Sequence, residues 1–196
     1  MTHSVAVVTA GLSEPSSTSL LGDRLTSAVR EAFGGDVSIV TIPLRPLAHE
    51  ITNALLNGFA AAELQSAYDA VAAADTLIAV TPTFNASYSG LFKSFFDALP
   101  ADVLVDKPVL IAATGGTERH SLVLEHALRP MFSYLGALVV PTGVYAASSD
   151  WGSGAALGER IARAARQLAK LVVAAPAGPS ADPFADVVPF EELLRG

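Results

Sequence analysis

The chain has 196 residues, of which 51% are hydrophobic and 16% charged, and its formal net charge is −7. This length and composition predict one domain with a full core. The basic residues are scattered and form no stripe, which argues against nucleic acid as a partner. No apolar run is long enough to span a bilayer, so no membrane segment is expected. The absence of cysteine excludes disulfides, thiolate metal sites and a cysteine nucleophile.

Strands and helices are expected to alternate along the chain. The first half is predicted to contain a strand over 4–9, a helix over 18–33, a strand over 37–42, helical segments over 51–74 broken near Gly58, and a strand over 76–80. The second half is predicted to contain a helix over 89–99, a strand over 109–113, a helix over 122–135, a strand over 138–144 and a helix over 155–173. Pro130 is expected to bend or restart the helix that contains it.

Five strands separated by helices indicate an α/β fold. The expected architecture is a doubly wound, flavodoxin-like parallel sheet of five strands in the order 2-1-3-4-5, covered by helices in three layers. Residues 1–174 are expected to form this domain. Residues 175–196 read as a Pro-rich tail, and Phe190 favours docking of that tail on this subunit or a neighbour. The N-terminus has no basic region before its first apolar run, so no signal peptide is expected and a cytoplasmic location is favoured.

Residues 81–90 follow the third predicted strand and lead into a helix. Pro82 makes the segment rigid, and Phe84 and Tyr88 offer flat aromatic surfaces. Asn85, Ser87 and Ser89 carry hydrogen-bonding groups, and Gly90 allows close approach of the backbone. Ligands of open α/β sheets bind where strands end. The segment therefore suits a planar heterocycle with polar edges. The alternative is an ordinary loop whose aromatic residues pack on the core.

The loop after the first strand is rich in hydroxyl groups. Five of the seven residues from Ser13 to Ser19 carry one, and they stand at the expected start of the first helix. Free backbone N–H groups and the helix dipole favour an anion there. A helix cap explains one hydroxyl and leaves the others unexplained. The loop is neither a P-loop nor a G-x-G-x-x-G fingerprint, and a phosphate monoester fits it better.

The loop after the fourth strand contains Gly115 and Gly116. Paired glycines let the backbone approach a flat ligand and present N–H groups to its polar edge. His120 follows, and it is expected at a surface or interface more readily than in catalysis. The four histidines show no spacing typical of metal ligands, so no metal site is expected.

The three loops together carry a resemblance to a known family. The sequences Gly-Leu-Ser-Glu-Pro-Ser-Ser-Thr-Ser from Gly11, Thr-Pro-Thr-Phe-Asn-Ala-Ser-Tyr-Ser-Gly-Leu-Phe-Lys from Thr81 and Ala-Thr-Gly-Gly-Thr-Glu-Arg-His from Ala113 resemble those of NADPH-dependent FMN reductases. The resemblance covers about residues 4–174. It is greatest to the branch that supplies reduced flavin to two-component, luciferase-like monooxygenases, such as those that desulfonate alkanesulfonates.

The resemblance implies roles for individual residues. It implies that the first loop binds the FMN phosphate, through Ser13, Ser17, Thr18 and Ser19. It implies that the second segment follows the isoalloxazine ring and ribityl chain, through Pro82, Thr83, Phe84, Asn85 and Ser87. It implies that the third loop meets the pyrimidine edge of the flavin, through Thr114, Gly115 and Gly116. Arg119 and His120 are expected beside the nicotinamide of NADPH or NADH.

Two positions depart from the family pattern. Many relatives carry arginine or asparagine in the first loop, where this chain has only hydroxyls near the phosphate, so FMN is expected to exchange freely. Many relatives have Tyr where this chain has Phe84, which keeps the stacking surface and loses a hydroxyl.

The resemblance implies an NAD(P)H:FMN oxidoreductase in which the flavin carries the chemistry and no side chain acts as nucleophile or base. It also implies a homodimer or homotetramer, and a partner monooxygenase that receives reduced FMN. Two alternatives remain open at this point: a quinone or azo reductase that retains its FMN, and a non-enzymatic flavin carrier or sensor.

Overall fold

The computed structural model describes residues 2–153 and 155–174. The first half contains β1 (His3–Thr9), α1 (Ser17–Ala32), β2 (Val37–Pro43), α2 (Ala48–Asn57), α3 (Ala62–Ala73), β3 (Thr76–Phe84) and β4 (Ser87–Tyr88). The second half contains α4 (Gly90–Ala98), β5 (Pro108–Gly115), η1 (Glu118–His120), η2 (Leu124–Leu128), α5 (Arg129–Tyr134), β6 (Leu138–Val139), β7 (Val144–Ala147), α6 (Asp150–Ser153) and α7 (Ala155–Ala174). The expected docking of Phe190 lies outside the described residues.

The parallel strands run side by side in the order β2-β1-β3-β5-β6, and β7 continues the last position by pairing with the other end of β5. This confirms the predicted 2-1-3-4-5 arrangement, with β5 as the fourth strand and β6 and β7 sharing the fifth place. The central strands β1, β3 and β5 are buried along almost their whole length. Their continuous apolar runs place side chains on both faces of the sheet, and each face needs a helical layer.

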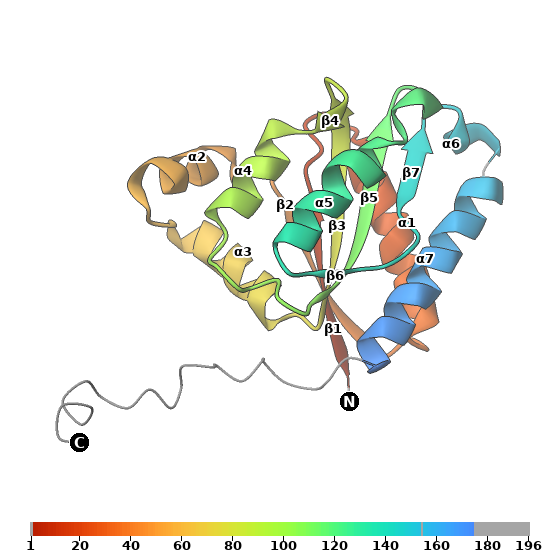
Figure 1. The fold of residues 1–196 in the computed structure, drawn as a ribbon, viewed down its shortest axis with the longest axis horizontal. Coiled ribbons are helices and arrows are strands. Elements are labelled where there is room, and N and C mark those ends of the chain that lie inside the picture. The colour runs from red at the N-terminus through yellow and green to blue at the C-terminus, as the bar shows by residue number, and fades with distance from the viewer. Residues whose placement is uncertain (1, 154, 175–196) are drawn as a thin grey trace, which may run out of the picture.

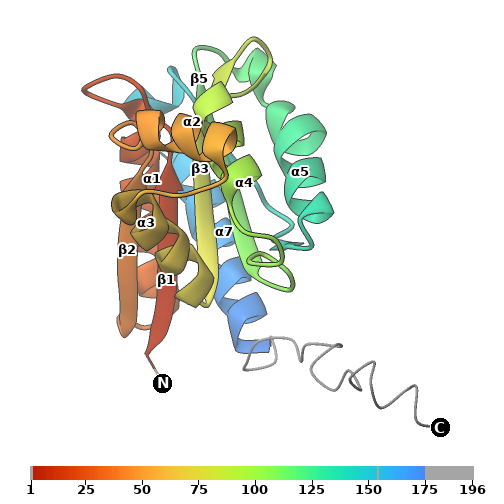
Figure 2. The ribbon, with the colours of Figure 1, turned by 90° about the vertical axis from the view of Figure 1, so that its left-hand side faces the viewer.

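Helices cover both faces of the sheet (Figures 1 and 2). On one face, α1 and α7 pack against alternate strand residues such as Val5, Val7, Ile78 and Leu110. On the other face, α2, α3, α4 and α5 pack against the intervening residues, such as Ala6, Val8, Leu77 and Ile111. The period-two alternation of strand side chains therefore builds two cores from the same strands.

The fifth predicted strand is divided. Pro141 and Gly143 interrupt it, and pairing with β5 resumes at β7, which extends to Ala147. Proline has no N–H to give to a sheet ladder. The next amide, that of Thr142, donates instead to Gln167 on α7 at 2.9 Å. The expectation of one continuous strand over 138–144 is thus corrected.

The helix expected over 122–135 is also irregular. It forms the π-helical turn η2 and then restarts as α5, with Pro130 in the first turn of α5. Proline is tolerated in a first turn and disrupts a helix interior, so the predicted restart at Pro130 is confirmed. Arg129 holds the junction, because its guanidinium donates to the carbonyls of Val140 and Pro141 at 3.0 Å each.

The phenylalanines of α4 belong to the core. Phe92, Phe95 and Phe96 are at most 3% exposed, and their rings pack edge-on against one another and against Phe132. These apolar residues are therefore not available for a subunit contact. Within the described residues, no helix is both long and apolar enough to cross a membrane.

Candidate functional site

The three loops singled out in the sequence meet at one edge of the sheet. They follow the carboxyl ends of β1, β3 and β5, which are immediate neighbours. Thr9 pairs with Val80 across the first boundary, and Pro82 pairs with Thr114 across the second. Parallel strands bring all their carboxyl ends to the same edge, so loops distant in sequence converge there.

The first loop ends in a capped helix. Ser16 is the N-cap of α1, and its hydroxyl accepts a hydrogen bond from the amide of Ser19 at 3.2 Å. The amides of Ser17 and Thr18 stand in the first turn, where helical geometry supplies no acceptor. Gly11 lies so close to the cap that an added Cβ would be 2.0 Å from the Ser16 hydroxyl oxygen. The loop is folded tightly around the start of the helix.

The predicted phosphate-binding hydroxyls point in different directions. Ser13 is exposed and donates to the carbonyl of Pro15 at 3.1 Å, and Ser17 is also exposed. Ser19 is half-buried. Thr18 is 2% exposed, and its hydroxyl oxygen lies 2.9 Å from that of Thr114. Thr18 and Thr114 thus join the first loop to the third.

The second segment is a hairpin and not the loop that was expected. β3 continues past Val80 to Phe84 and returns as β4, with Phe84 opposite Ser87. The two turn residues, Asn85 and Ala86, have φ of 48° and 65°. Such values are typical of a type I′ turn, whose twist matches that of a two-stranded hairpin. Asparagine tolerates positive φ, but alanine is strained there.

The hairpin presents both aromatic and polar groups. Phe84 is 45% exposed near its tip, while Tyr88 is half-buried against Phe92 with ring centroids 6.1 Å apart. The Thr83 hydroxyl oxygen is buried, and the Tyr145 phenol is its neighbour. Pro82 and Ser87 are half-buried, and Asn85 is exposed.

The third segment begins inside the sheet. β5 runs to Gly115, two residues beyond the predicted end, and Gly116 then starts the loop to η1. An added Cβ on Gly116 would meet no atom within 4 Å, so this position is open to a ligand. Arg119 and His120 are both exposed on η1.

Four polar residues that were assigned no contact with FMN hold this edge together: Ser16, Thr81, Ser89 and Tyr145. Ser89 caps α4 by accepting from the Phe92 amide at 3.2 Å, and its own amide donates to the buried Thr81 hydroxyl at 3.0 Å. Ser16 caps α1, and Tyr145 on β7 donates to the Thr117 carbonyl at 2.8 Å. The two serines had a sequence signal, since serine before an apolar helix predicts a cap. Tyr145 had none, because its contact depends on the pairing of β7 with β5.

An ion pair joins the first loop to the turn after β2. Arg45, on the turn after β2, pairs with Glu14 in the first loop at 3.0 Å, and both side chains are largely exposed. Within residues 2–153 and 155–174, no group of three histidine or acidic side chains stands where it could hold a metal ion.

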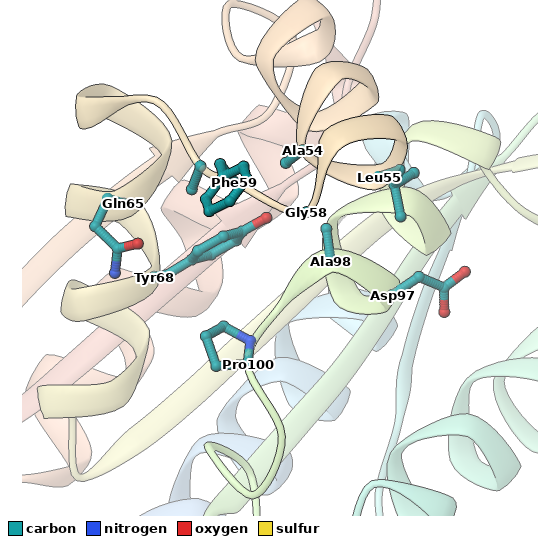
Figure 3. Close-up of a pocket in the computed structure, with 10 residues that line it drawn as sticks. Ala54, Leu55, Gly58, Phe59, Gln65, Tyr68, Asp97, Ala98 and Pro100 are labelled. Atoms are coloured by element: carbon teal, nitrogen blue, oxygen red, sulfur yellow. The ribbon is translucent and has the colours of Figure 1, made fainter.

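Two cavities border α4. One of about 420 Å³ lies between β4, α4 and the η2–α5 segment and includes Ser87 and Tyr88. The other, of about 310 Å³, lies between α2, α3 and α4 and is lined by none of the predicted site residues (Figure 3).

Comparison with known proteins agrees with this geometry. Residues 3–152 match the family described as NADPH-dependent FMN reductase. An FMN reductase (NADPH) of Pseudomonas aeruginosa is 41% identical over 75% of this chain and 78% of its own. An NADH-dependent FMN reductase, SfnE, of Pseudomonas putida is 38% identical over 85% and 91%. The crystal structure of an oxidoreductase from Corynebacterium diphtheriae superposes with a TM-score of 0.84 at 47% identity, covering 87% of this chain and 97% of that one. The chain belongs to the NADPH-dependent FMN reductase family, and it is a flavodoxin-like oxidoreductase that uses FMN and NADPH or NADH.

Proposed function

We propose that the protein reduces FMN with NAD(P)H at the edge formed by the β1, β3 and β5 loops and releases reduced FMN to a two-component monooxygenase. The observation that carries the proposal is the convergence of three family-matching segments on adjacent strand ends. The flavodoxin-like edge explains where a flavin binds, and family membership explains which reaction is performed.

The residues at this edge fit FMN. The first-turn amides of α1 suit a phosphate, because they are donors at the positive end of a helix. The Thr83 side chain lies where the second and third segments meet, since its Cβ is 3.6 Å from the position of a Cβ added on Gly115. Gly116 leaves space for close backbone approach, and exposed Phe84 offers a flat surface.

FMN held at this edge by the α1 amides, Gly116 and Phe84 would supply the redox chemistry, because a flavin accepts two electrons as hydride from NAD(P)H, which is thereby oxidised. The protein contributes position. It must hold the two rings in stacking contact, about 3–3.5 Å apart. The third loop must direct its amide N–H groups at the pyrimidine edge, where the negative charge of reduced flavin is greatest.

We assign the nicotinamide side of the site to Arg119 and His120. Both are exposed on η1, directly after the glycines of the third loop. Replacing both with glutamine is expected to raise the KM for NADPH and leave the Kd for FMN near its original value. Steady-state kinetics at saturating FMN measures the first quantity, and fluorescence quenching of FMN measures the second. An unchanged KM for both NADPH and NADH in the double variant contradicts this assignment.

Release of reduced FMN is supported by the chemistry of the first loop. From Gly11 to Ser19 the loop has no lysine or arginine, and the nearby Arg45 is paired with Glu14. Phosphate then depends on neutral donors, which bind less strongly than charge-assisted ones. The experiment mixes the protein with a large excess of FMN and NADPH without oxygen. Bleaching of the whole flavin pool supports release, whereas bleaching of one equivalent favours a quinone or azo reductase that retains FMN.

A homodimer or homotetramer is part of the proposal. Large apolar groups are exposed near the end of α2 and on α5, at Leu55, Leu56, Phe59 and Tyr134. Exposed apolar groups of this size are typical of protein contacts. Light scattering during gel filtration gives the mass directly, and a monomer at micromolar concentration contradicts this part of the proposal.

A further inference from the structure

Tyr145 lies against the backbone of the third loop. It stands on β7 opposite Ala113 of β5 and is 7% exposed. Its hydroxyl donates to the carbonyl of Thr117 at 2.8 Å, which closes the chain segment that contains Gly115 and Gly116. Burial, the largest cause, raises the pKa of the phenol, so it remains a donor at neutral pH.

The phenol also accounts for the glycine at position 115. An added Cβ there would be 2.0 Å from the Tyr145 hydroxyl oxygen, 3.1 Å from the ring carbon that bears it and 3.6 Å from the Cβ of Thr83. No side chain fits between these groups without moving one of them. Tyr145 thus lies beside Thr83 of the second segment and Gly115 of the third.

Tyr145 is itself anchored from the opposite side of the sheet. Arg160 of α7 donates to the Tyr145 carbonyl at 3.3 Å and to the Asp150 carboxylate at 3.1 Å. The other carboxylate oxygen of Asp150 accepts from the Ala147 amide at 2.8 Å. Hydrogen bonds at Tyr145 and Ala147 therefore tie β7 to α7 and α6. The phenol extends from a strand that both helices hold.

We propose that Tyr145 is a positioning residue that holds the amide N–H groups of the third loop in the orientation that favours reduced FMN over oxidised FMN. The proposal rests on the proposed function. The hydroxyl restrains the loop through the Thr117 carbonyl. Under the proposed function the loop amides would face the pyrimidine edge of the flavin, which gains negative charge on reduction. Hydrogen bonds to a charged acceptor are stronger than those to a neutral one, so misdirected amides weaken binding of the reduced form more.

The test compares Tyr145→Phe with Tyr68→Phe. Both remove the hydroxyl of a buried tyrosine, but Tyr68 stands on α3 and lines a cavity that contains none of the predicted site residues. The Kd values for oxidised FMN and, without oxygen, reduced FMN are measured by titration. Tyr145→Phe is expected to raise the Kd for reduced FMN about three- to tenfold, the equivalent of one lost hydrogen bond, and to raise the Kd for oxidised FMN less. Tyr68→Phe is expected to change neither.

An equal rise in both Kd values, with a lowered melting temperature, shows a merely structural role and overturns the proposal. So does a Tyr145→Phe protein that binds both forms as the original does. If the unmodified protein neither binds FMN nor reduces it, the proposed function itself is wrong. That result differs from the two outcomes above, in which the unmodified protein binds FMN.

A second variant keeps the proposal testable if Tyr145→Phe unfolds. Gly115→Ala would place a Cβ 2.0 Å from the Tyr145 hydroxyl oxygen, so it is expected to displace the phenol and raise the Kd for reduced FMN more than that for oxidised FMN. Equal effects of Gly115→Ala on both redox forms contradict the proposal.

Discussion

The hydroxyl oxygens of Thr18 and Thr114 lie 2.9 Å apart although 96 residues separate them in the chain. Thr18 is in the first turn of α1, and Thr114 is near the end of β5. Both side chains are almost completely buried. The pair therefore links the loop expected to bind phosphate to the loop expected to face the pyrimidine ring, from the α1 side of the sheet. On the opposite side Tyr145 restrains the same third loop.

A double-mutant cycle tests the Thr18–Thr114 pair. Valine has nearly the shape of threonine, so Thr114→Val removes one hydroxyl and leaves the other buried without this partner. Each single variant is expected to lose about 1–3 kcal/mol of unfolding free energy. The double variant is expected to lose less than the sum, because no buried hydroxyl then lacks a partner. Urea denaturation measures all four proteins, and strictly additive losses contradict the pairing.

The turn at Asn85 and Ala86 predicts a stabilising substitution in the hairpin. Ala86 has φ of 65°, a conformation that strains alanine and that glycine adopts readily. Ala86→Gly is expected to raise the unfolding free energy by about 0.5–1 kcal/mol, since relief of strain exceeds the added chain entropy. Urea denaturation measures the change.

A matched control is Ala72→Gly on α3. Ala72 is exposed and lies within a helix, so glycine is expected to lower stability there by up to about 1 kcal/mol. A loss of stability in Ala86→Gly as large as that in Ala72→Gly would show that the turn is unstrained.

Tyr68 lines the cavity between α2, α3 and α4 (Figure 3). It is 3% exposed, and its hydroxyl has no hydrogen-bond partner among the described residues. Tyr68→Phe is therefore expected to preserve or raise the unfolding free energy, by up to about 1 kcal/mol, because a buried hydroxyl without a partner is costly. Chemical denaturation checks the sign, with Tyr134→Phe as an exposed control. A loss above 1 kcal/mol would mean that the hydroxyl does have a partner.

The Glu125–Arg129 pair predicts a pH dependence of stability. Hydrogen bonds from Arg129 at 2.6 and 3.0 Å, the largest cause, hold the pKa of Glu125 below its ordinary value of 4.5, while burial opposes the shift. Because the pKa of Glu125 is lower in the folded state, ionised Glu125 adds to the free energy of unfolding above pH 4.5. This stabilisation is lost as the pH falls through the lower, folded-state pKa.

Glu125→Gln is accordingly expected to lower the urea midpoint at neutral pH. The difference in unfolding free energy between the two proteins is expected to be small, at most about 1 kcal/mol, because Glu125 is half exposed. It is expected to shrink as the pH falls below 4.5. The check is a series of urea curves for both proteins from neutral pH to about pH 3. A difference that stays constant across the series would rule out this ionic contribution.

The sheet was predictable because its central strands are continuous apolar runs such as Val5-Ala6-Val7-Val8. Strand ends were predicted less well, since Pro82, Thr83 and Phe84 look like a loop in sequence and become part of β3 only by pairing with β4 and β5. Likewise Gly115 joins β5 because β7 pairs with it. The residue at which such a strand ends is set by pairing with neighbouring strands, which the local propensity of the sequence does not reveal.

The site was predictable to the extent that its residues are local. The three loops could be predicted from hydroxyls, glycines and aromatics beside strand ends. The contacts of Thr18 with Thr114 and of Tyr145 with Thr117 could not, because each joins segments that meet only after the sheet forms. Burial identifies Phe92, Phe95 and Phe96 as core residues, which the sequence does not reveal because core and interface phenylalanines have the same pattern.

The most direct test of the central claim is a crystal structure of the protein with FMN. The account predicts the FMN phosphate within hydrogen-bond distance of the Ser17 and Thr18 amides, with the ring beside Phe84 and its pyrimidine edge at Gly115 and Gly116. Flavin bound only elsewhere, such as between α2, α3 and α4, or an empty three-loop edge at saturating FMN, would contradict it.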